Sequence, residues 1–499
     1  MKFNLSKFSS QKTASFFFII SFLFYLFVIL YARFGFIYDE GFYALMISEF
    51  SKDPSMIIPT LTGIAVEWKP PLFAWAYSIF YILLNWLPIS PESIFRIPSA
   101  VFSALSVSFL YLIAEKLYDR KTAIITAFLF MSTPSLLFSS SITMLEALAI
   151  FFITASIYMY LKGKLVYGAF FLGLIILTKW LYVIAPVVFL VLYFLIPSQV
   201  KKLDSSYSHP QSKSSGSQIG KTYLDENKKK ELKTVVLSFV AVPLAFLLYL
   251  TLSYFFGNFD NAILNLTLDM SRPVPSFDIG RTAVFFFMTL GFTFPLSLFF
   301  IFFLLKDMKL ITQNIHLVGM GALAFLMPLS QYYIFWYSII AVPAFALFIG
   351  RKIEEVGDIR FSSILVIFIM IANIVVFVYF PSMDYRQDAK WIGEFSHGKN
   401  VTLYDCGNLY SQWKSINERY LGTNESYLLL EQNYPGILFY RFNDAKDYEN
   451  LHALFLANND TISCDSEYLI VSCNISVPNC YVLYSERNSY LIHTLNSDS

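Results

Sequence analysis

The sequence predicts a polytopic α-helical membrane protein with a small external α/β domain at its C-terminal end. Hydrophobic residues make up 56% of the 499-residue chain, charged residues only 14%, and the mean hydropathy is +0.57. A soluble domain usually carries about 25% charged residues. The 36 basic and 35 acidic residues almost cancel, so the cationic excess of a nucleic-acid-binding protein is absent. Composition therefore excludes a soluble multidomain enzyme and a nucleic-acid binder.

Eleven apolar runs are long enough to be membrane spans, which need about 20 residues to cross roughly 30 Å of hydrocarbon. They lie at 14–32, 97–114, 122–138, 144–161, 165–178, 181–197, 234–256, 283–305, 314–329, 332–350 and 361–380. The first run is longer than a signal-peptide core and lacks an Ala-x-Ala site, which indicates a signal anchor. A twelfth stretch, Leu72 to Leu87, follows two prolines and is rich in Trp and Tyr, which favours an interfacial helix.

Charge placement predicts the orientation. With the N-terminus in the cytoplasm and 72–87 on the outer surface, the cytoplasmic segments hold 21 of the 36 basic residues, as the positive-inside rule requires. If 72–87 crossed the membrane, the lysine-rich segment 198–233 would lie outside. We therefore expect a multi-pass protein of the cell (plasma) membrane, with a cytoplasmic N-terminus and an external C-terminal domain.

Two soluble segments are attached to the predicted transmembrane core. Residues 198–233 form a Ser/Lys-rich cytoplasmic loop with few apolar residues, which predicts disorder. Residues 381–499 follow the transmembrane core (1–380) and predict a separate α/β domain. Its strands are expected at 401–404, 436–442, 468–472 and 481–484, and its helices at 388–395, 412–420 and 445–456.

The cysteines support an external C-terminal domain. All four follow the last predicted span, at Cys406, Cys464, Cys473 and Cys480. Two disulfides form readily only in an oxidising compartment; the three pairings of four cysteines stay open. The domain also carries 15 acidic against 8 basic residues, which keeps it away from an anionic membrane surface.

Charged residues gather at the outer ends of the predicted spans, where charge near hydrocarbon is costly and marks function. Each has a simpler interpretation on its own: Asp39 as a helix cap, Lys69 as a snorkelling lysine, Glu146 and Lys179 as interfacial anchors. Together they mix carboxylates with cations on one side of the membrane, while the middles of the spans are almost free of charge. A pump or channel typically buries ionisable groups at mid-span. The four clusters are Asp39-Glu40, Glu67-Trp-Lys69 with Arg96, Thr143-Met-Leu-Glu146, and Thr178-Lys179.

The order of these motifs resembles the GT-C superfamily of integral-membrane glycosyltransferases. The resemblance covers roughly residues 15–350 and is closest to the dolichyl-phosphate-mannose protein mannosyltransferases (glycosyltransferase family 39) and their bacterial relatives that transfer 4-amino-4-deoxy-L-arabinose to lipid A. This sequence departs from the family at Glu146, where Asp is more common, at Trp180 in place of Gly, and at Gln331 in place of a basic residue. The motifs are Asp39-Glu40-Gly-Phe-Tyr-Ala, Glu67-Trp-Lys69-Pro-Pro-Leu, Arg96-Ile-Pro-Ser-Ala, Leu177-Thr-Lys179, and Tyr332-Tyr333 with Pro343.

The resemblance implies an inverting transfer of a monosaccharide from a polyprenyl (dolichyl-type) phosphate to a hydroxyl of a protein, lipid or cell-envelope glycan at the outer face. Asp39 is the expected base and Glu40 its orienting partner. The leaving phosphate would be held by cations, first Lys69, then Arg96, Lys179 and Arg272 of the external loop 257–282. Substrate contacts are implied for Glu67, Glu146, Tyr332 and Tyr333.

Three other functions stay open at this point. An oligosaccharyltransferase would share Asp39 and the topology but usually carries a Trp-Trp-Asp-type motif, which is absent here. An enzyme of lipid-linked glycan assembly would share every motif. A membrane transporter is disfavoured, because matching broken helices and an internal repeat are not seen. The need for a divalent cation also stays open; Asp39, Glu67 or Glu146 would hold it, and carboxylate oxygens favour Mg²⁺ or Mn²⁺.

Overall fold

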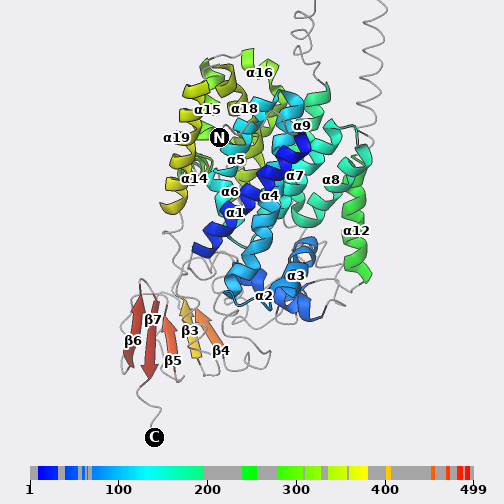
Figure 1. Cartoon of the computed structure of the whole chain (residues 1–499). Helices are drawn as coiled ribbons and strands as arrows, with labels where there is room; N and C mark the ends of the chain where they lie inside the picture. The colour runs from blue at the N-terminus through cyan, green and yellow to red at the C-terminus, as the bar shows by residue number, and fades with distance from the viewer. Residues whose placement is uncertain are drawn as a thin grey trace, which may run out of the picture.

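The chain folds into a helical bundle followed by a small mixed sheet (Figure 1). The computed structural model describes residues 9–31, 40–53, 59–61, 64–65, 70–195, 236, 239–255, 279–306, 309–326, 335–356, 359–379, 401–405, 451–455, 468–471, 480–486 and 489–494. The predicted disordered loop 198–233 and the cysteines Cys406, Cys464 and Cys473 lie outside these residues.

Most of the bundle is α-helical, with two short 3₁₀ segments. The 3₁₀ segments are η2 (Trp180–Val183) and η4 (Phe335–Ala341). The helices are α1 (Ser10–Tyr31), α2 (Glu40–Lys52), α3 (Leu72–Leu84), α4 (Pro91–Leu117), α5 (Arg120–Met131), α6 (Pro134–Ser141), α7 (Leu145–Leu161), α8 (Leu165–Lys179), α9 (Ile184–Leu195), α12 (Ala241–Phe255), α14 (Ile279–Phe292), α15 (Leu296–Lys306), α16 (Lys309–Gln313), α17 (Ile315–Leu326), α18 (Val342–Glu355) and α19 (Ile359–Tyr379).

Every predicted apolar run coincides with one helix or two consecutive helices. Three helical stretches of the described chain are by themselves long and apolar enough to cross a membrane: Ser10–Leu30, Pro91–Leu117 and Leu165–Phe194. Two bent helix pairs raise this number to five, and five further apolar helical stretches of 10–17 residues lie in the described chain: Leu72–Leu84, Leu145–Leu161, Ala241–Phe255, Ile315–Leu326 and Ser362–Val375. Membrane spanning is thus supported, while the number of eleven spans and their orientation stay predictions.

Two of the predicted spans are broken. The run predicted at 122–138 is divided into α5 and α6, which meet at 59°. Proline disrupts a helix interior but is tolerated in the first turn, so Pro134 ends the first helix and begins α6. Two neighbours satisfy polar groups at this break. Tyr25 OH on α1 donates to Met131 O at 2.9 Å, and Asn373 Nδ2 on α19 donates to Ser132 Oγ at 3.1 Å. The run predicted at 283–305 is likewise divided into α14 and α15, bent by 102°.

Side-chain caps fix where α4 and α5 begin. Ser90 Oγ accepts the N–H of Ser93 and Pro91 occupies the first turn of α4, as at many helix N-termini. Asp119 accepts the N–H groups of Lys121 and Thr122 at the start of α5. The caps matter for the site, because the start of α4 sets the position of Arg96 in its second turn.

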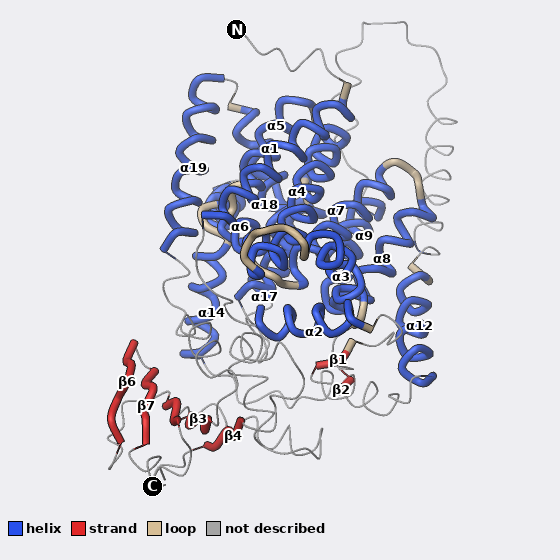
Figure 2. The backbone as a smooth tube through the Cα atoms, turned by 60° about the horizontal axis from the view of Figure 1, so that its bottom comes forward, coloured by secondary structure: helices blue, strands red, loops and turns tan. Residues whose placement is uncertain are grey.

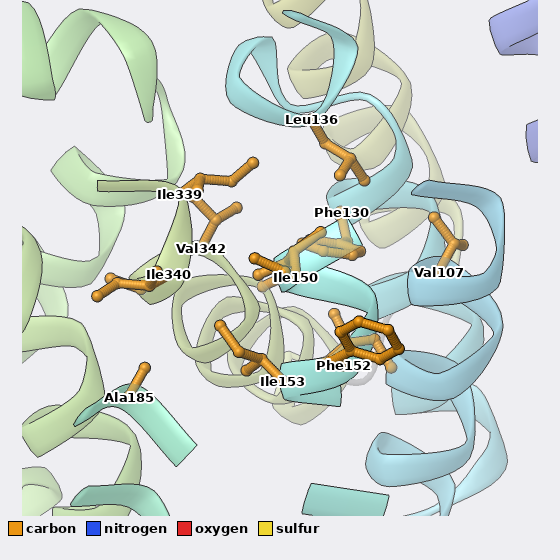
Figure 3. Close-up of a cluster of buried hydrophobic side chains, with 14 of the residues drawn as sticks. Val107, Phe130, Leu136, Ile150, Phe152, Ile153, Ala185, Ile339, Ile340 and Val342 are labelled. Carbon is orange, nitrogen blue, oxygen red and sulfur yellow. The ribbon is translucent and has the colours of Figure 1, made fainter. Parts of the chain in front are cut away.

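The core lies where α4, α5, α6 and α7 meet α9, η4 and α18, as the close-up in Figure 3 shows. Ile150 and Ile153 of α7 lie at its centre, with Ile340 and Val342 on one side and Phe130 on another. A Cβ at Gly350 would lie 2.3 Å from Thr126 Oγ1 and 3.2 Å from the Thr126 backbone, so glycine allows α18 to approach α5 closely. The late helices are therefore packed directly on the early ones.

Helix α3 is the stretch for which an interfacial position is predicted. Its 13 residues span about 20 Å, too short to cross the hydrocarbon core. One face is buried by Phe73, Ala74 and Tyr77, whereas Ile79, Ile82 and Leu83 on the other are at least half exposed. One-sided burial and short length both favour a helix that lies in the membrane surface. It packs beside α2 and the start of α4 (Figure 2).

The C-terminal strands form one five-stranded sheet in the order β4-β3-β5-β7-β6, parallel across β4, β3 and β5 and antiparallel beyond. In Figure 1 it lies at the end of the bundle that carries α2 and α3. Three predicted strands are confirmed, whereas the helix predicted at 445–456 is wrong, because Leu451–Phe455 within it forms β4 and pairs with β3. The predicted strand 436–442 and helices 388–395 and 412–420 lie outside the described residues. The strands are β3 (Val401–Asp405), β4 (Leu451–Phe455), β5 (Tyr468–Val471), β6 (Cys480–Glu486) and β7 (Ser489–Thr494); a hairpin of β1 (Thr60–Leu61) and β2 (Ile64–Ala65) belongs to the bundle.

Candidate active site

A buried ion pair joins the first residue of α2 to the second turn of α4. Arg96 Nε donates to Glu40 Oε1 at 2.8 Å, and Arg96 Nη2 to Glu40 Oε2 at 2.6 Å. Both side chains are at most 1% exposed. This is the bidentate geometry in which a guanidinium binds a carboxylate most strongly. The pair was not evident from the sequence, because 56 residues separate its members.

Glu40 also binds the backbone between α6 and α7. The N–H of Thr143 donates to Glu40 Oε1 at 2.7 Å. One carboxylate therefore fixes α2, α4 and the segment 142–144 relative to one another. Asp39, the predicted base, directly precedes Glu40 in the sequence but lies outside the described residues.

A second buried carboxylate lies three residues after Thr143. Glu146, in the first turn of α7, accepts a hydrogen bond from Lys179 Nζ at 2.5 Å and another from Tyr182 OH at 3.1 Å, both on Oε1. The glutamate is 1% exposed and the lysine 16%. A carboxylate in the first turn of a helix is further favoured by the helix dipole. The pair forms because α8 returns along α7 and ends at Lys179.

Aromatic rings surround the Lys179 ammonium. Its Nζ lies 4.7 Å from the ring centre of Tyr182 and 3.9 Å from that of Tyr337, within the range of a cation–π interaction. Lys179, the last residue of α8, has extended backbone angles, φ −159° and ψ 92°, and directly precedes the 3₁₀ turn that supplies Tyr182. A carboxylate and two rings thus hold this lysine in one place.

Tyr337 brings the late part of the chain into this cluster. It lies on η4, and its ring contacts that of Tyr182 edge-on at 6.0 Å. The predicted residues of the same Tyr-rich run, Tyr332 and Tyr333, lie outside the described residues, so their roles stay predictions. Tyr337, which reaches Lys179, was not among the predicted site residues.

We expect Tyr337→Leu to lower activity about 3- to 30-fold and Tyr337→Phe to have little effect, because a cation–π interaction of roughly 0.5–2 kcal/mol depends on the ring and not on the hydroxyl. The measurement is the steady-state rate of each variant with kcat and KM resolved. Equal losses in both variants would show that the hydroxyl, not the ring, is what matters.

Tyr77 of α3 connects α4 to the segment that lies between Thr143 and Glu146. Its OH lies 2.9 Å from Ser99 Oγ on α4 and donates to Met144 O at 3.3 Å. Thr143, Met144 and Glu146 are therefore held by α2, α3 and α8 in turn. The structure brings together four predicted site residues: Glu40, Arg96, Glu146 and Lys179.

The other predicted site residues lie outside the described residues: Asp39, Glu67, Lys69, Arg272, Tyr332 and Tyr333. Among the residues that the structure describes, no group of three His, Cys, Asp or Glu side chains could hold a metal ion. That set contains Glu146 but neither Asp39 nor Glu67, so the metal question stays open.

Sequence and structure comparisons place this site in a known context. The model of the dolichyl-phosphate-mannose-protein mannosyltransferase family matches residues 68–211, a range that contains Lys69, Arg96, Glu146 and Lys179. No curated protein sequence matches the chain.

Solved structures share the fold over almost the whole chain. ArnT from Cupriavidus metallidurans bound to undecaprenyl phosphate superposes with a TM-score of 0.59 and 14% identity, covering 96% of this chain and 98% of that one. Its apo state gives 0.57 and 13%, with 97% and 98% covered. An oligosaccharyltransferase from Archaeoglobus fulgidus reaches 0.45 and 13%, covering 83% of this chain and 60% of that one.

The matched segment and the shared fold support a membrane glycosyltransferase that resembles the GT-C enzymes. More particularly, the chain resembles the dolichyl-phosphate-mannose protein mannosyltransferases and ArnT, as its motifs predicted. The predicted resemblance and enzyme class are thereby confirmed.

Proposed function

We propose that the protein is an inverting glycosyltransferase that moves a monosaccharide from a polyprenyl phosphate to an acceptor hydroxyl at the outer membrane face. The observation that carries the proposal is the pair of carboxylate–cation contacts Glu40–Arg96 and Glu146–Lys179 on either side of the segment 143–146. Arg96, Glu146 and Lys179 lie within the segment that matches the mannosyltransferase family. ArnT, which shares the fold, was solved with undecaprenyl phosphate, and this supports a lipid phosphate as the carrier.

The chemistry assigns one step to Asp39. Its carboxylate takes the proton of the acceptor hydroxyl while that oxygen attacks the anomeric carbon. The bond from the anomeric carbon to the phosphate oxygen breaks, and the lipid phosphate leaves with the bonding electron pair. Because attack and departure occur on opposite faces, one displacement inverts the anomeric centre, with the acceptor in the place of the water of an inverting glycosidase.

Glu40 and Arg96 act through position in this proposal. The Arg96 guanidinium is committed to Glu40 by two short hydrogen bonds, so we place it in support of the site rather than on the phosphate. The pair fixes the start of α2, directly after Asp39. A positioned base raises the rate because the reacting atoms meet in the correct geometry.

The leaving phosphate is assigned to Lys69, with Arg272 and Lys179 as secondary cations. Lys179 is the weaker of the lysines in this role, because Glu146 lies 2.5 Å from its ammonium and balances its charge. Glu67, Tyr332 and Tyr333 remain proposed substrate contacts. The acceptor is proposed only as a hydroxyl of a protein, lipid or glycan.

Release of free polyprenyl phosphate tests the proposal. The full-length protein in nanodiscs is incubated with polyprenyl-phosphate monosaccharides and a membrane extract as acceptor. We expect release with at least one sugar, and transfer of label to a product in the extract. A correctly folded protein that releases nothing from any monosaccharide donor would overturn the proposal; donors carrying an oligosaccharide on pyrophosphate would then be tried.

We expect Lys69→Ala to lower the release rate more than Lys179→Ala does, because the Glu146 carboxylate 2.5 Å from the Lys179 ammonium already balances the charge that Lys179 could offer to the leaving phosphate. Both rates are measured at saturating acceptor, with Lys162→Ala between α7 and α8 as the control for loss of a lysine. The reverse order would move the phosphate to the end of α8.

A further inference from the structure

Two buried polar atoms in the segment 143–146 have no hydrogen-bond partner among the residues that the structure describes. They are Thr143 Oγ1 and Glu146 Oε2. Their residues are 0% and 1% exposed. Three other polar groups of the segment are bound: the Thr143 N–H by Glu40, Met144 O by Tyr77, and Glu146 Oε1 by Lys179 and Tyr182.

Buried polar atoms without a hydrogen-bond partner are rare in folded proteins, so these two are informative. Buried polar groups in native proteins are nearly always paired, and an exception calls for a function. Here a hydroxyl and a carboxylate oxygen are unpartnered within one turn of chain, on the segment that both ion pairs hold in place. A ligand that supplied the missing partners would meet a preformed site.

The residue types select the chemistry of that ligand. A carboxylate oxygen only accepts, so it needs a donor and disfavours a phosphate oxygen. Lys179 already balances the charge of Glu146, which favours a neutral hydroxyl over an ammonium group. The Thr143 hydroxyl can donate or accept. The Glu146 Oε2 atom can accept a hydrogen bond from one sugar hydroxyl, and the Thr143 hydroxyl can bind the neighbouring one.

We propose that Thr143 and Glu146 bind hydroxyl groups of the monosaccharide during its transfer, and so determine which sugar the enzyme accepts. This proposal rests on the function proposed above. It adds Thr143 to the site, and it assigns Glu146 Oε2, rather than the Lys179-bound Oε1, to the substrate.

The test compares a sugar donor with its deoxy analogues. Once a donor is found, each ring hydroxyl is replaced in turn by hydrogen on the same polyprenyl phosphate, and kcat/KM is measured. For the wild type we expect at least one analogue to react about 10- to 100-fold more slowly than the parent sugar, because the missing hydroxyl leaves a buried acceptor of the enzyme unpaired. Thr143→Val should lower kcat/KM for the parent sugar but shrink the penalty for that analogue to about 3-fold or less, and Glu146→Gln should act likewise.

Two control variants make the result specific. Thr143→Ser keeps the hydroxyl and should retain the penalty. Thr154→Val removes a buried hydroxyl from the middle of α7, where the hydroxyl donates to Ile150 O at 3.0 Å, and should change neither the rate nor the penalty. A penalty that survives in both Thr143→Val and Glu146→Gln, or equal rates for every analogue, would overturn this inference while leaving the transfer reaction intact. Absence of release from all donors would instead overturn the proposed function, and this inference with it.

Discussion

Asp39→Asn is expected to abolish glycosyl transfer while leaving the protein folded. The change removes the proposed base at almost constant shape, and general-base catalysis contributes about 100- to 10,000-fold to a rate. Transfer is measured as release of polyprenyl phosphate, and folding as the apparent Tm in detergent, which should match the wild type. Asparagine has almost the same shape as aspartate, so we expect little loss of stability.

Asp53→Asn provides the control for Asp39. It also removes one carboxylate, at the other end of α2 from Glu40, where the side chain is exposed. Its transfer rate should equal that of the wild type. Full activity in Asp39→Asn would remove Asp39 from the mechanism and direct attention to Glu67, the carboxylate of the Glu67-Trp-Lys69 motif.

Arg96→Met is expected to destabilise the protein more than any other single change at the site. It leaves the Glu40 carboxylate buried and uncompensated, and breaking such a pair costs about 3–5 kcal/mol. We expect lower yield, a reduced apparent Tm, and loss of transfer. Removing both charges with Glu40→Gln and Arg96→Met together should restore much of the stability, because an uncharged pair needs no compensation and the amide oxygen can still accept from Thr143 N–H.

The double variant separates structure from catalysis. If the Glu40–Arg96 pair positions Asp39, the double variant should be stable but slow, with kcat reduced more than KM is raised. Arg351→Met is the matched control, since its ion pairs with Asp119 and Glu355 are more than a third exposed and pairs of this kind contribute about 0–1 kcal/mol. A double variant with full activity would reduce the pair to a purely structural role.

The positions of the helices in the bundle were predictable from the sequence, because the bilayer requires apolar helices. Hydrocarbon demands long apolar helices, so each run found by hydropathy became a helix or a helix pair. Hydropathy averages over a whole span, however, and could not show that Thr133-Pro134 divides 122–138 into two helices. In the sheet, local pattern favoured a helix at 445–456, but backbone pairing of Leu451–Phe455 with β3 outweighed that preference.

The sequence by itself determined which residues carry charge at the ends of the apolar runs, because charge beside hydrocarbon is too costly to be accidental. Glu40, Arg96, Glu146 and Lys179 were all found in this way. Tertiary structure alone decided that they pair as Glu40 with Arg96 and Glu146 with Lys179, across 56 and 33 residues. It also decided that the ring of Tyr337, an uncharged residue, lies 3.9 Å from the Lys179 ammonium. Pairing of this kind depends on which helices pack side by side, and hydropathy does not show which helices are neighbours.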